Sequence, residues 1–597
     1  MTVIDRPDTG QEAFGREQFR AEGAGLLEGL AECGNLGQAR QRLLANLNAV
    51  FTYHWDPERS TPSHARIRSR DCGRALRTML EPRSEQRSGF SLAKALWDVA
   101  AGWPRPDLGE GFFADLIHLV RGLECRSPFH LLQDARPYDG LSGREAALAR
   151  SDELDALWQR VEAGMARYSD GLDETVVARR RRRRQQVLAA LGGSESDWDD
   201  WRWQVAHAFR DERGLGQAVR LSADEAVAIR LAVEHGLPFA VTPYYAALMD
   251  DEGDADRAVR AQVIPPDDYV RALSESGRAA CDFMREADTS PADRVTRRYP
   301  GIAILKPCLA CPQVCVYCQR NWELAASAQE EGAGPDGIAA GLDYIRQHRS
   351  IREVLVTGGD PLLLDDQALF DVLDRLAEID HVDLIRIGTR TPVVMPMRIT
   401  EEVARRLGGL RRLGRRDLAV VTHVEHPYEI TPELAEAVDR LRRQGLGVYN
   451  QQVYTFYVSR RFETAALRML LRRVGIDPYY SFAPKAKPET RSYRVPIARI
   501  LQERREEARL LPGLRRTDEP VYNVPGLGKN HLRAAQHRDL LCIRGDGARM
   551  YEFHAWEKNV VRRASHISAD VPILDYLRRL AEIGEDPAEY QSIWYYF

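Results

Sequence analysis

The chain has 597 residues, 44% hydrophobic and 29% charged, with a formal net charge of −4 at pH 7. That length leaves room for roughly three or four domains. The slightly acidic balance excludes a broadly basic nucleic-acid surface. The sequence has no apolar run long enough to cross a membrane, and the polar segment 1–19 is unlike a signal peptide. We therefore expect a cytoplasmic protein without a membrane partner.

Two residue types are unevenly used. Only six of the 84 basic residues are lysine, and the other 78 are arginine. A GC-rich genome accounts for this bias, yet each lysine is worth inspecting because lysine, unlike arginine, can become neutral in a protein. Four of the nine cysteines fall within the eleven residues 308–318. Such a tight group indicates a ligand set.

The first third of the chain predicts helices and no chemistry. Residues 1–190 carry few strand signals, and hydrophobic periodicity predicts helices over 38–49 and 111–123. Six consecutive arginines occupy 179–184. We interpret them as a solvated helix face or linker, with an anion or nucleic-acid patch as the alternative. A further helical region follows, from Trp198 to about residue 292.

A regular alternation of strands and helices begins near residue 302. The predicted strands are 302–306, 353–357, 384–388, 418–423, 448–454 and 477–482, and the predicted helices are 335–347, 366–378, 400–412, 431–444 and 461–473. Asp365 and Thr431 stand where helix N-caps belong. Right-handed crossovers make such a sheet parallel, so we expect an α/β fold, either doubly wound or an open barrel, with function at the carboxyl ends of the strands. Residues 511–597 are a mixed tail.

The cysteine motif, Cys308-Leu-Ala-Cys311-Pro-Gln-Val-Cys315-Val-Tyr-Cys318, directly follows the first predicted strand. A zinc ribbon needs a spacer of roughly 12–20 residues between its cysteine pairs, and a disulfide is not expected in a cytoplasmic chain. The x3 and x2 spacing of Cys311, Cys315 and Cys318 suits a thiolate-bound iron–sulfur cluster with one iron left open. We interpret Cys308 as a packed loop thiol, with an adventitious ligand as the alternative.

This spacing, with an aromatic residue before the last cysteine, resembles that of radical S-adenosylmethionine (SAM) enzymes. From Trp198 to about Lys529 the chain resembles the lysine 2,3-aminomutase family in particular. The matching segments are Arg298-Tyr299-Pro300, Thr357-Gly358-Gly359-Asp360-Pro361-Leu362, residues 385–394 with Arg390, His423-x-x-His426-Pro427 and Asn450-Gln451. The ordered set is far more specific than any one of these motifs.

The resemblance implies a radical SAM partial (β/α)6 barrel with a large helical N-terminal region and a small mixed C-terminal extension. We divide the chain into a helical extension of unknown role, a flanking helical region, the barrel, and a segment with the lysine that binds pyridoxal 5′-phosphate (PLP). The corresponding ranges are 1–190, 191–292, 293–510 and 511–597. The C-terminal cysteine cluster with which the family binds zinc has no counterpart here, so we predict no structural zinc.

The resemblance also implies three cofactors: a [4Fe–4S] cluster, SAM and PLP. Gly358 and Gly359 would let the backbone approach SAM, and Asp360 would accept from its ammonium. The sequence match extends the cofactor-binding set to Arg390. Lys529, which closes the segment Pro525-Gly-Leu-Gly-Lys, would form the Schiff base with PLP; the alternative is a surface turn.

The phosphate of PLP would have to be bound in a modified way. Ile302 stands where lysine-acting members carry a second arginine. Phosphate binding is therefore expected to depend on Arg298, with Tyr299, Asn450 and Gln451 as the other implied PLP-site residues.

The substrate-binding positions favour an acidic amino acid. Arg320, two residues after the last cluster cysteine, would bind the α-carboxylate. Where lysine-acting members hold the substrate ammonium with two aspartates, this chain has Lys485 and Asn523, as in glutamate-acting members. These residues cannot satisfy a buried ammonium but can pair with a side-chain carboxylate. The alternative interpretation is that Lys485 is a solvent-facing loop lysine without a role in substrate binding.

The resemblance implies an isomerase that moves an amino group from C2 to C3 and converts L-glutamate to β-glutamate. Alternatives are aspartate, lysine or another amino acid, a protein-borne residue, a non-catalytic scaffold, or a nucleic-acid-binding role for 179–184. The family resemblance also implies an external electron donor of the flavodoxin or ferredoxin type and a homo-oligomer. We expect no nucleic-acid partner.

Overall fold

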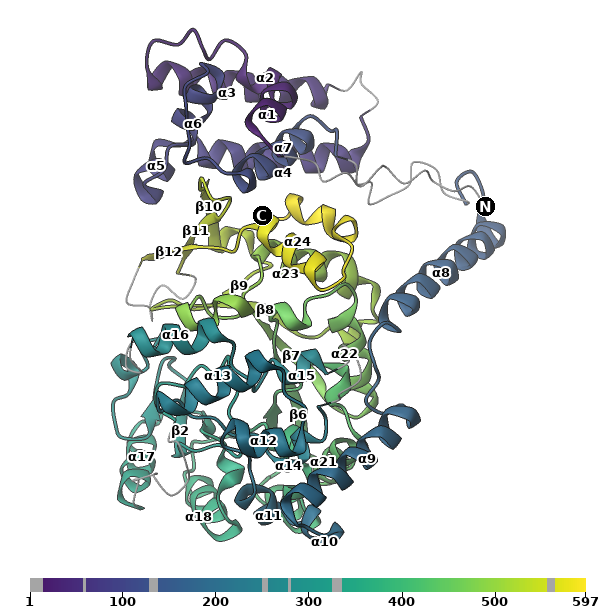
Figure 1. Cartoon of the computed structure of the whole chain (residues 1–597), viewed down its shortest axis with the longest axis vertical. Helices are drawn as coiled ribbons and strands as arrows, with labels where there is room; N and C mark the ends of the chain where they lie inside the picture. The colour runs from purple at the N-terminus through teal and green to yellow at the C-terminus, as the bar shows by residue number, and fades with distance from the viewer. Residues whose placement is uncertain are drawn as a thin grey trace.

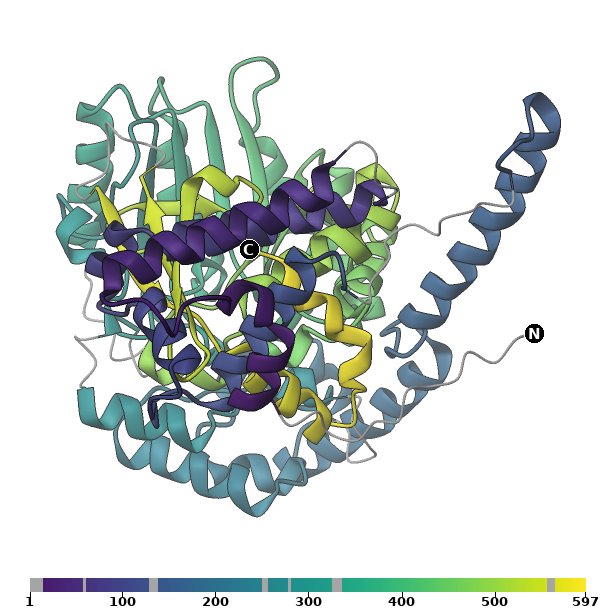
Figure 2. The ribbon, with the colours of Figure 1, turned by 90° about the horizontal axis from the view of Figure 1, so that it is seen from above.

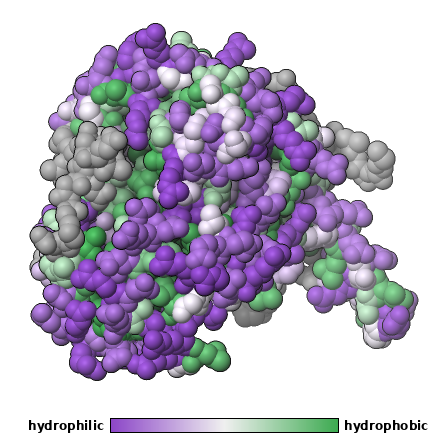
Figure 3. All heavy atoms as spheres, turned by 90° about the horizontal axis from the view of Figure 1, so that it is seen from below, coloured by the Kyte–Doolittle hydropathy of each residue, from purple (hydrophilic) through white to green (hydrophobic). Residues whose placement is uncertain are grey.

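A computed structural model describes residues 14–56, 61–127, 138–249, 256–276, 281–324, 335–555 and 564–597. Within these ranges the chain is a mixed α/β protein built on one large sheet and one small sheet. No helix in the described ranges is long and apolar enough to cross a membrane. On the face in Figure 3, hydrophobic residues lie scattered among hydrophilic side chains.

The N-terminal region is helical, as predicted. Its helices are α1 (Arg16–Glu22), α2 (Ala24–Leu27), α3 (Leu36–Trp55), α4 (Ser63–Met79), α5 (Pro82–Ser88), α6 (Leu92–Ala100) and α7 (Glu110–Leu123). The predicted helices 38–49 and 111–123 are confirmed as parts of α3 and α7. Asn35 begins α3 by accepting a hydrogen bond from the Gln38 N–H at 2.9 Å, a standard N-cap contact.

Two long helices connect this region to the remainder. Helix α8 (Gly143–Met165) buries only Val161 and extends away from the body of the molecule (Figure 2). Helix α9 (Glu174–Leu191) carries the six arginines. The prediction of a solvated face is wrong for Arg180 and Arg183, which are buried. Residues three apart share a helix face, so these two arginines turn together toward the core.

Arg180 is held by a specific set of contacts. It donates to the carbonyl of Gly171 at 2.9 Å and to that of Tyr428, and its guanidinium lies 4.2 Å from the Tyr428 ring centre. The arginine run therefore fastens α9 to the body of the molecule.

The region that flanks the large sheet is also helical, as predicted from Trp198 onward. It comprises α10 (Glu195–Trp198), α11 (Trp201–Ala206), α12 (Glu212–Ala218), α13 (Ala223–Glu234), α14 (Pro243–Ala246), α15 (Arg257–Arg260) and α16 (Asp267–Ser276). Residues of this region share one hydrophobic core with the large sheet and its helices.

The large sheet has nine strands in sequential order. They are β1 (Val295–Thr296), β2 (Ile302–Cys308), β3 (Glu353–Gly358), β4 (Leu384–Gly388), β5 (Asp417–Thr422), β6 (Gly447–Val453), β7 (Asp477–Phe482), β8 (Glu519–Val524) and β9 (Gly528–His531). Strands β2 to β8 are parallel, and β1 and β9 pair antiparallel at the edges. The six predicted strands are confirmed, and their order is not the reversed order of a doubly wound sheet.

Helices connect successive parallel strands. They are α17 (Pro335–Gln347), α18 (Asp366–Ala377), α19 (Thr391–Val394), α20 (Glu401–Gly409), α21 (Pro432–Arg443) and α22 (Glu463–Arg473). The two predicted N-caps are confirmed: Asp365 accepts from the Ala368 N–H at 2.8 Å, and Thr431 from the Leu434 N–H at 3.0 Å. The connections bring the carboxyl ends of the strands to one edge of the sheet.

Strand β8 is a seventh parallel strand that the sequence did not predict. It pairs with β7, so the sheet continues past residue 510, where the sequence predicts a boundary. Between β7 and β8 lie α23 (Ile497–Gln502) and a π-helical turn, η9 (Glu503–Glu507). Asp518, just before β8, is buried and accepts from Arg468 at 2.7 and 3.0 Å and from Ser481 at 2.6 Å. These contacts hold the start of β8 against α22 and β7.

The C-terminal part packs under the N-terminal helices. It contains β10 (Arg538–Ile543), β11 (Arg549–His554) and β12 (Ser565–Ala569), which form an antiparallel sheet, and α24 (Ile573–Glu582). In Figure 1 it lies directly below the N-terminal helices. Its buried residues and those of α1–α7 form a single hydrophobic core. Asp115 of α7 and Arg549 of β11 make a buried pair with two contacts of 2.8 Å.

Candidate active site at the carboxyl ends of the strands

The cysteine loop follows β2 directly. Cys311, Cys315 and Cys318 are half-buried, whereas Cys308 is buried at the end of β2 and its thiol donates to the Ala310 carbonyl at 3.3 Å. Burial raises the pKa of Cys311, Cys315 and Cys318. Neighbouring thiols raise the pKa of Cys311 and Cys315 further, whereas contacts with Arg320 and Lys487 act against burial at Cys318. Three such thiols on one loop would not lose their protons unaided. They fit a metal cluster, because coordination to metal deprotonates a thiol.

The glycine pair after β3 makes room for this loop. Gly358 has φ +123°, which glycine alone adopts readily, and a Cβ at Gly359 would lie 2.2 Å from the Ala310 carbonyl oxygen. The Gly359 N–H donates to the Cys308 carbonyl at 2.7 Å. The two glycines therefore let the backbone of β3 lie directly against the cysteine loop.

Asp360 is engaged by the protein itself. Its buried carboxylate accepts from Thr389 Oγ1 at 2.6 Å and from the N–H groups of Leu362, Arg390 and Thr391 at 3.0, 2.9 and 3.1 Å. These four bonds use the roughly four acceptor positions of a carboxylate. Asp360 thus joins the β3 loop to the β4 loop, and its predicted contact with the SAM ammonium remains a prediction.

Arg390 reaches the cysteine loop from the end of β4. Its Nη1 lies 2.8 Å from Cys315 Sγ, and its Nη2 donates to Glu429 Oε1 at 2.7 Å. The Arg390 charge acts against burial on the pKa of Cys315. Tyr245 and Gln262, from the flanking helical region, also contact its Nη2. Arg390 therefore favours a thiolate at Cys315.

The predicted PLP lysine lies on the β8–β9 hairpin. The register places Lys529 directly opposite Asn523, so their side chains share one face. The Lys529 N–H donates to the Tyr299 hydroxyl at 3.3 Å, and its Nζ lies 4.3 Å from the Tyr480 ring centre. Gly528, at φ +79°, gives the Tyr299 hydroxyl room, because a Cβ there would lie 2.4 Å from it. Three predicted site residues thus come together.

A second group of predicted residues forms a cationic cluster around Glu286. Arg320 donates to the Glu286 carboxylate through Nε and Nη2 at 3.0 and 3.1 Å, and Arg298 Nη2 lies 3.9 Å from it. Burial opposes ionisation of Glu286, but Arg320, Arg298 and Lys485 lower its pKa to about 2. Three cations therefore surround Glu286, and Arg320 also lies 3.5 Å from a second carboxylate, Glu323.

Lys485 is the unsatisfied member of this cluster. Its Nζ is buried and makes no hydrogen bond within the described ranges. Burial, together with the charges of Lys487, Arg298 and Arg320, lowers the pKa of Lys485 well below its usual value, against the opposing effect of Glu286. Lys487 on the same loop is paired instead: its Nζ lies 2.7 Å from Asn321 Oδ1 and 2.6 Å from Glu489.

The two β6 residues predicted to bind PLP differ in whether their side chains are already hydrogen-bonded within the protein. The Asn450 amide is buried and bonds the Val424 backbone at both ends, at 2.7 and 2.9 Å. It positions the β5 loop. Gln451, one residue on, faces the other side of the strand and is half-buried.

Glu286, Tyr245 and Gln262 contact predicted site residues but are not marked by any motif in the sequence. All three come from the helical flank. The only available signal is the position of Glu286 shortly before Arg298-Tyr299-Pro300.

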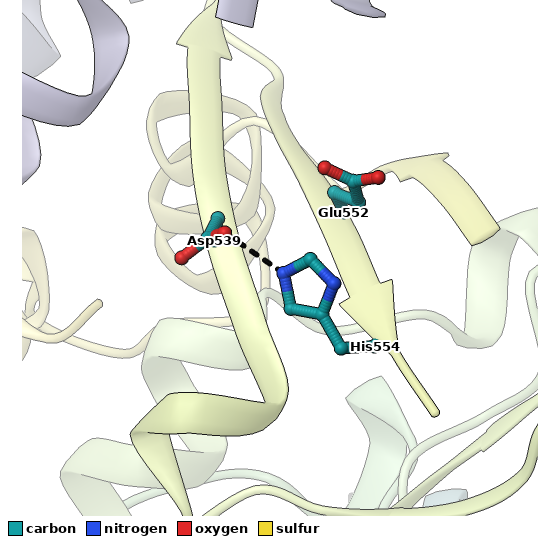
Figure 4. A group of neighbouring side chains, drawn as sticks. All are labelled: Asp539, Glu552 and His554. Atoms are coloured by element: carbon teal, nitrogen blue, oxygen red, sulfur yellow. Dashed lines mark hydrogen bonds and ion pairs between the residues drawn. The ribbon is translucent and has the colours of Figure 1, made fainter. Parts of the chain in front are cut away.

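One group outside this site has the geometry of a metal site. Asp539 on β10 and Glu552 and His554 on β11 place donor atoms within 4.8 Å of one another, with His554 Nε2 2.8 Å from Asp539 Oδ2 (Figure 4). However, Arg83 and Arg87 of α5 donate to Glu552 at 2.6 and 2.7 Å. These cations satisfy the carboxylate, so the group is an ion-pair network that links α5 to the small sheet.

Comparisons with known proteins place this site in a family. No family model matches the chain. An uncharacterized KamA family protein of Methanocaldococcus jannaschii is 43% identical over 539 residues, 86% of each chain. The glutamate 2,3-aminomutase of Clostridioides difficile is 34% identical over 52% of this chain and 71% of its own, and the L-lysine 2,3-aminomutase of Clostridium subterminale is 32% identical over 52% and 72%.

Fold and site define a mixed α/β protein with a cysteine loop and a lysine hairpin at the carboxyl ends of its strands. The chain belongs to the KamA family, together with the lysine and glutamate 2,3-aminomutases. The members of this family are enzymes, and the aminomutases among them are isomerases. Because the M. jannaschii match spans 86% of the chain, it must include a large part of residues 1–190. The two aminomutase matches span only 52% of the chain.

Proposed function

We propose that the protein is a radical SAM, PLP-dependent 2,3-aminomutase that moves the amino group of an acidic amino acid, L-glutamate above all, from C2 to C3. Family membership supports the aminomutase class. The sequential parallel strands support a radical SAM partial barrel around the site. The choice of an acidic substrate depends on the residues around Lys485.

The residues present fit the implied cofactors. Cys311, Cys315 and Cys318 are the three thiols expected for the cluster, and Arg390 favours the thiolate at Cys315. Lys529 stands on a glycine turn beside Tyr299. When bound, the cluster and SAM would supply the radical that removes hydrogen, and PLP would carry the migrating amino group. The chain's own residues orient the substrate and exclude water.

The observation that carries the substrate assignment is the buried, unsatisfied ammonium of Lys485. Within the described ranges its Nζ has no hydrogen-bond partner, although Arg298, Arg320 and Glu286 are near enough to shift its pKa. A buried cation without a partner is costly unless a ligand supplies the opposite charge. A second carboxylate, on the substrate side chain, would satisfy it, whereas an ammonium would be repelled.

In this proposal, each residue of the cluster around Glu286 has a separate role. Arg320 would bind the substrate α-carboxylate through N–H groups that Glu286 does not use, and Lys485 would bind the side-chain carboxylate. Glu286 keeps the Arg320 fork oriented and reduces the repulsion among the three cations. Asn523, opposite Lys529 on the hairpin, lies on the face where the amino group would be held.

The test is product analysis with the reduced holoenzyme. Enzyme reconstituted with iron, sulfide, SAM and PLP is incubated separately with glutamate, aspartate and lysine, and β-amino acids are identified by mass spectrometry. We expect β-glutamate to form with the highest kcat/KM. Formation of β-lysine without β-glutamate would overturn the acidic-substrate assignment.

Variants test the role of Lys485 directly. Removing a buried charged partner costs about 2–5 kcal/mol of binding, so Lys485→Met should lower kcat/KM for glutamate by about 100-fold. Lys485→Arg, which keeps the charge, should retain more activity. Lys94→Met, at a half-exposed lysine of α6, is the matched control and should behave as wild type. Equal activity of Lys485→Met and wild type would contradict the assignment.

A further inference from the structure

An arginine-lined cavity lies between α4, residues 501–533 and the tyrosines at 595 and 596, and its lining includes none of the candidate active-site residues named above. Its volume is about 690 Å³. Six of its thirteen lining residues are arginine: Arg68, Arg504, Arg505, Arg509, Arg516 and Arg533. At the arginine content of the chain, 78 in 597, thirteen residues would include only one or two. The enrichment therefore exceeds the compositional bias.

Negative charge in the lining is scarce. Asp71 is the only carboxylate among its described lining residues, and it lies 3.2 Å from Arg70. Neither Arg505 nor Arg509 forms an ion pair with any residue that the structure describes. The cavity thus concentrates positive charge that the surrounding protein only partly neutralises.

Several of the guanidinium groups are held in place by residues outside the cavity lining or by backbone carbonyls. Arg504 donates to Asp518 Oδ1 at 3.1 Å and to the Arg516 carbonyl at 2.8 Å, and Arg516 donates to the Arg509 carbonyl at 3.0 Å. Arg533 lies 3.4 Å from Glu519. Such contacts fix side chains that would otherwise be mobile, as the residues behind a binding site do.

Two further arginines stack on the terminal tyrosines. The Arg68 guanidinium lies 4.7 Å from the Tyr595 ring centre, and the Arg505 guanidinium 5.4 Å from that of Tyr596. Stacking fixes the plane of a guanidinium and leaves in-plane N–H groups able to donate. The π-helical turn η9 turns consecutive residues Arg504 and Arg505 into the same cavity; such turns are frequent at functional sites.

We propose that this cavity binds a small molecule that carries two or more phosphate groups. Arginine forks bind phosphate bidentately, and six of them exceed what one phosphate can use. The volume falls within the range of about 300–1,000 Å³ typical of small-molecule sites. Ile67, Leu501 and the two tyrosine rings give an apolar wall that would suit the base or ring of a nucleotide.

The position of the cavity connects such a ligand to the active-site hairpin. Asp518 and Glu519, which hold Arg504 and Arg533, stand at the start of β8, and Arg533 follows Lys529 by four residues. A ligand here would bridge α4 and Arg533, two residues after β9.

The experiment is calorimetric titration of the reconstituted full-length enzyme with inorganic phosphate, pyrophosphate and ATP at matched ionic strength. We expect saturable binding of pyrophosphate or ATP, much tighter than that of phosphate. If ATP binds and pyrophosphate does not, the apolar wall contributes to recognition; if both bind equally, the phosphates alone are recognised. No saturable binding of either up to about 1 mM would overturn the proposal.

A double variant tests the location. Arg505→Gln with Arg509→Gln removes two arginines that lack ion pairs, and should weaken pyrophosphate and ATP binding by at least about tenfold while leaving the ligand-free melting temperature unchanged. Arg213→Gln with Arg230→Gln, on α12 and α13, is the matched control and should bind as wild type. Equal binding by both double variants, or binding of RNA alone, would overturn the proposal.

Discussion

At the scale of single residues, polar and charged side chains of the site differ in whether the protein already provides their hydrogen-bond partners. The four acceptor positions of Asp360 are filled by its own loops, and Asn450 bonds the Val424 backbone at both ends. Lys485 has no such partner among the residues that the structure describes. A sequence motif predicts all three positions alike, because it records which residue is present and not which atoms it contacts. The unpartnered residue is the one that leaves an interaction for a substrate.

Lys485→Met should stabilise the ligand-free protein. The substitution replaces a buried unpaired ammonium by an apolar chain of similar length, so the free energy of unfolding should rise by about 1–2 kcal/mol. Urea unfolding of the cofactor-free protein measures it. Lys487→Met should do the opposite, because it leaves Glu489 without its cation. If both variants lose stability, Lys485 has a structural partner after all.

The same substitution gives a defined pH dependence. The pKa of Lys485 is lowered by burial and the neighbouring cations, so between its folded value and about 10.4 the unfolded chain binds more protons. The free energy of unfolding of the wild-type protein therefore rises with pH across that window. The destabilisation caused by burying the charged Lys485 is largest below the folded pKa. The stability advantage of Lys485→Met should be larger at pH 7 than at pH 9.5. An advantage that does not change with pH would contradict the lowered pKa.

At the scale of elements, the sequence predicts what depends on local pattern. The six strands 302–482 and the N-caps Asp365 and Thr431 follow from periodicity and capping, and the structure confirms them. Strand β8 was missed because its place is fixed by distant contacts, chiefly Arg468 and Ser481 with Asp518. Glu286 was missed for the same reason: only the fold brings it to Arg320.

The glycine pair after β3 is visible in the sequence, but the contact that requires it, with the cysteine loop, is made only in the folded chain. In Gly359→Ala, the new Cβ would meet the Ala310 carbonyl oxygen at 2.2 Å and push the cysteine loop away from β3. We expect iron content per chain to fall to less than about half after reconstitution, with loss of the cluster absorption. Gly409→Ala is the control, because a Cβ there meets nothing within 4 Å. Full iron loading of Gly359→Ala would contradict this packing.

At the scale of the whole molecule, the N-terminal region is not an appendage. Its buried residues, such as Phe112 and Leu116, share one core with Ile543, Phe553 and the terminal segment. Ion pairs join the same parts as well, among them Asp115 with Arg549, and Glu552 with both Arg83 and Arg87. Arg549 also donates to the Trp594 and Tyr596 carbonyls, at 2.7 and 2.6 Å. The C-terminal part, which follows the β8–β9 hairpin, is therefore folded against the helices α1–α7.

This shared core predicts that the site cannot be separated from residues 1–127. Deleting them should give aggregated protein, because it exposes the apolar side of the C-terminal part. Asp115→Asn is the milder test: it leaves the Arg549 charge buried without its carboxylate, so it should cost about 3–5 kcal/mol, measured by urea unfolding. Asp343→Asn, at an exposed pair with Arg346, should cost less than about 0.5 kcal/mol. A truncated protein that is monodisperse and loads PLP on Lys529, detected by borohydride trapping, would show instead that the C-terminal part folds alone.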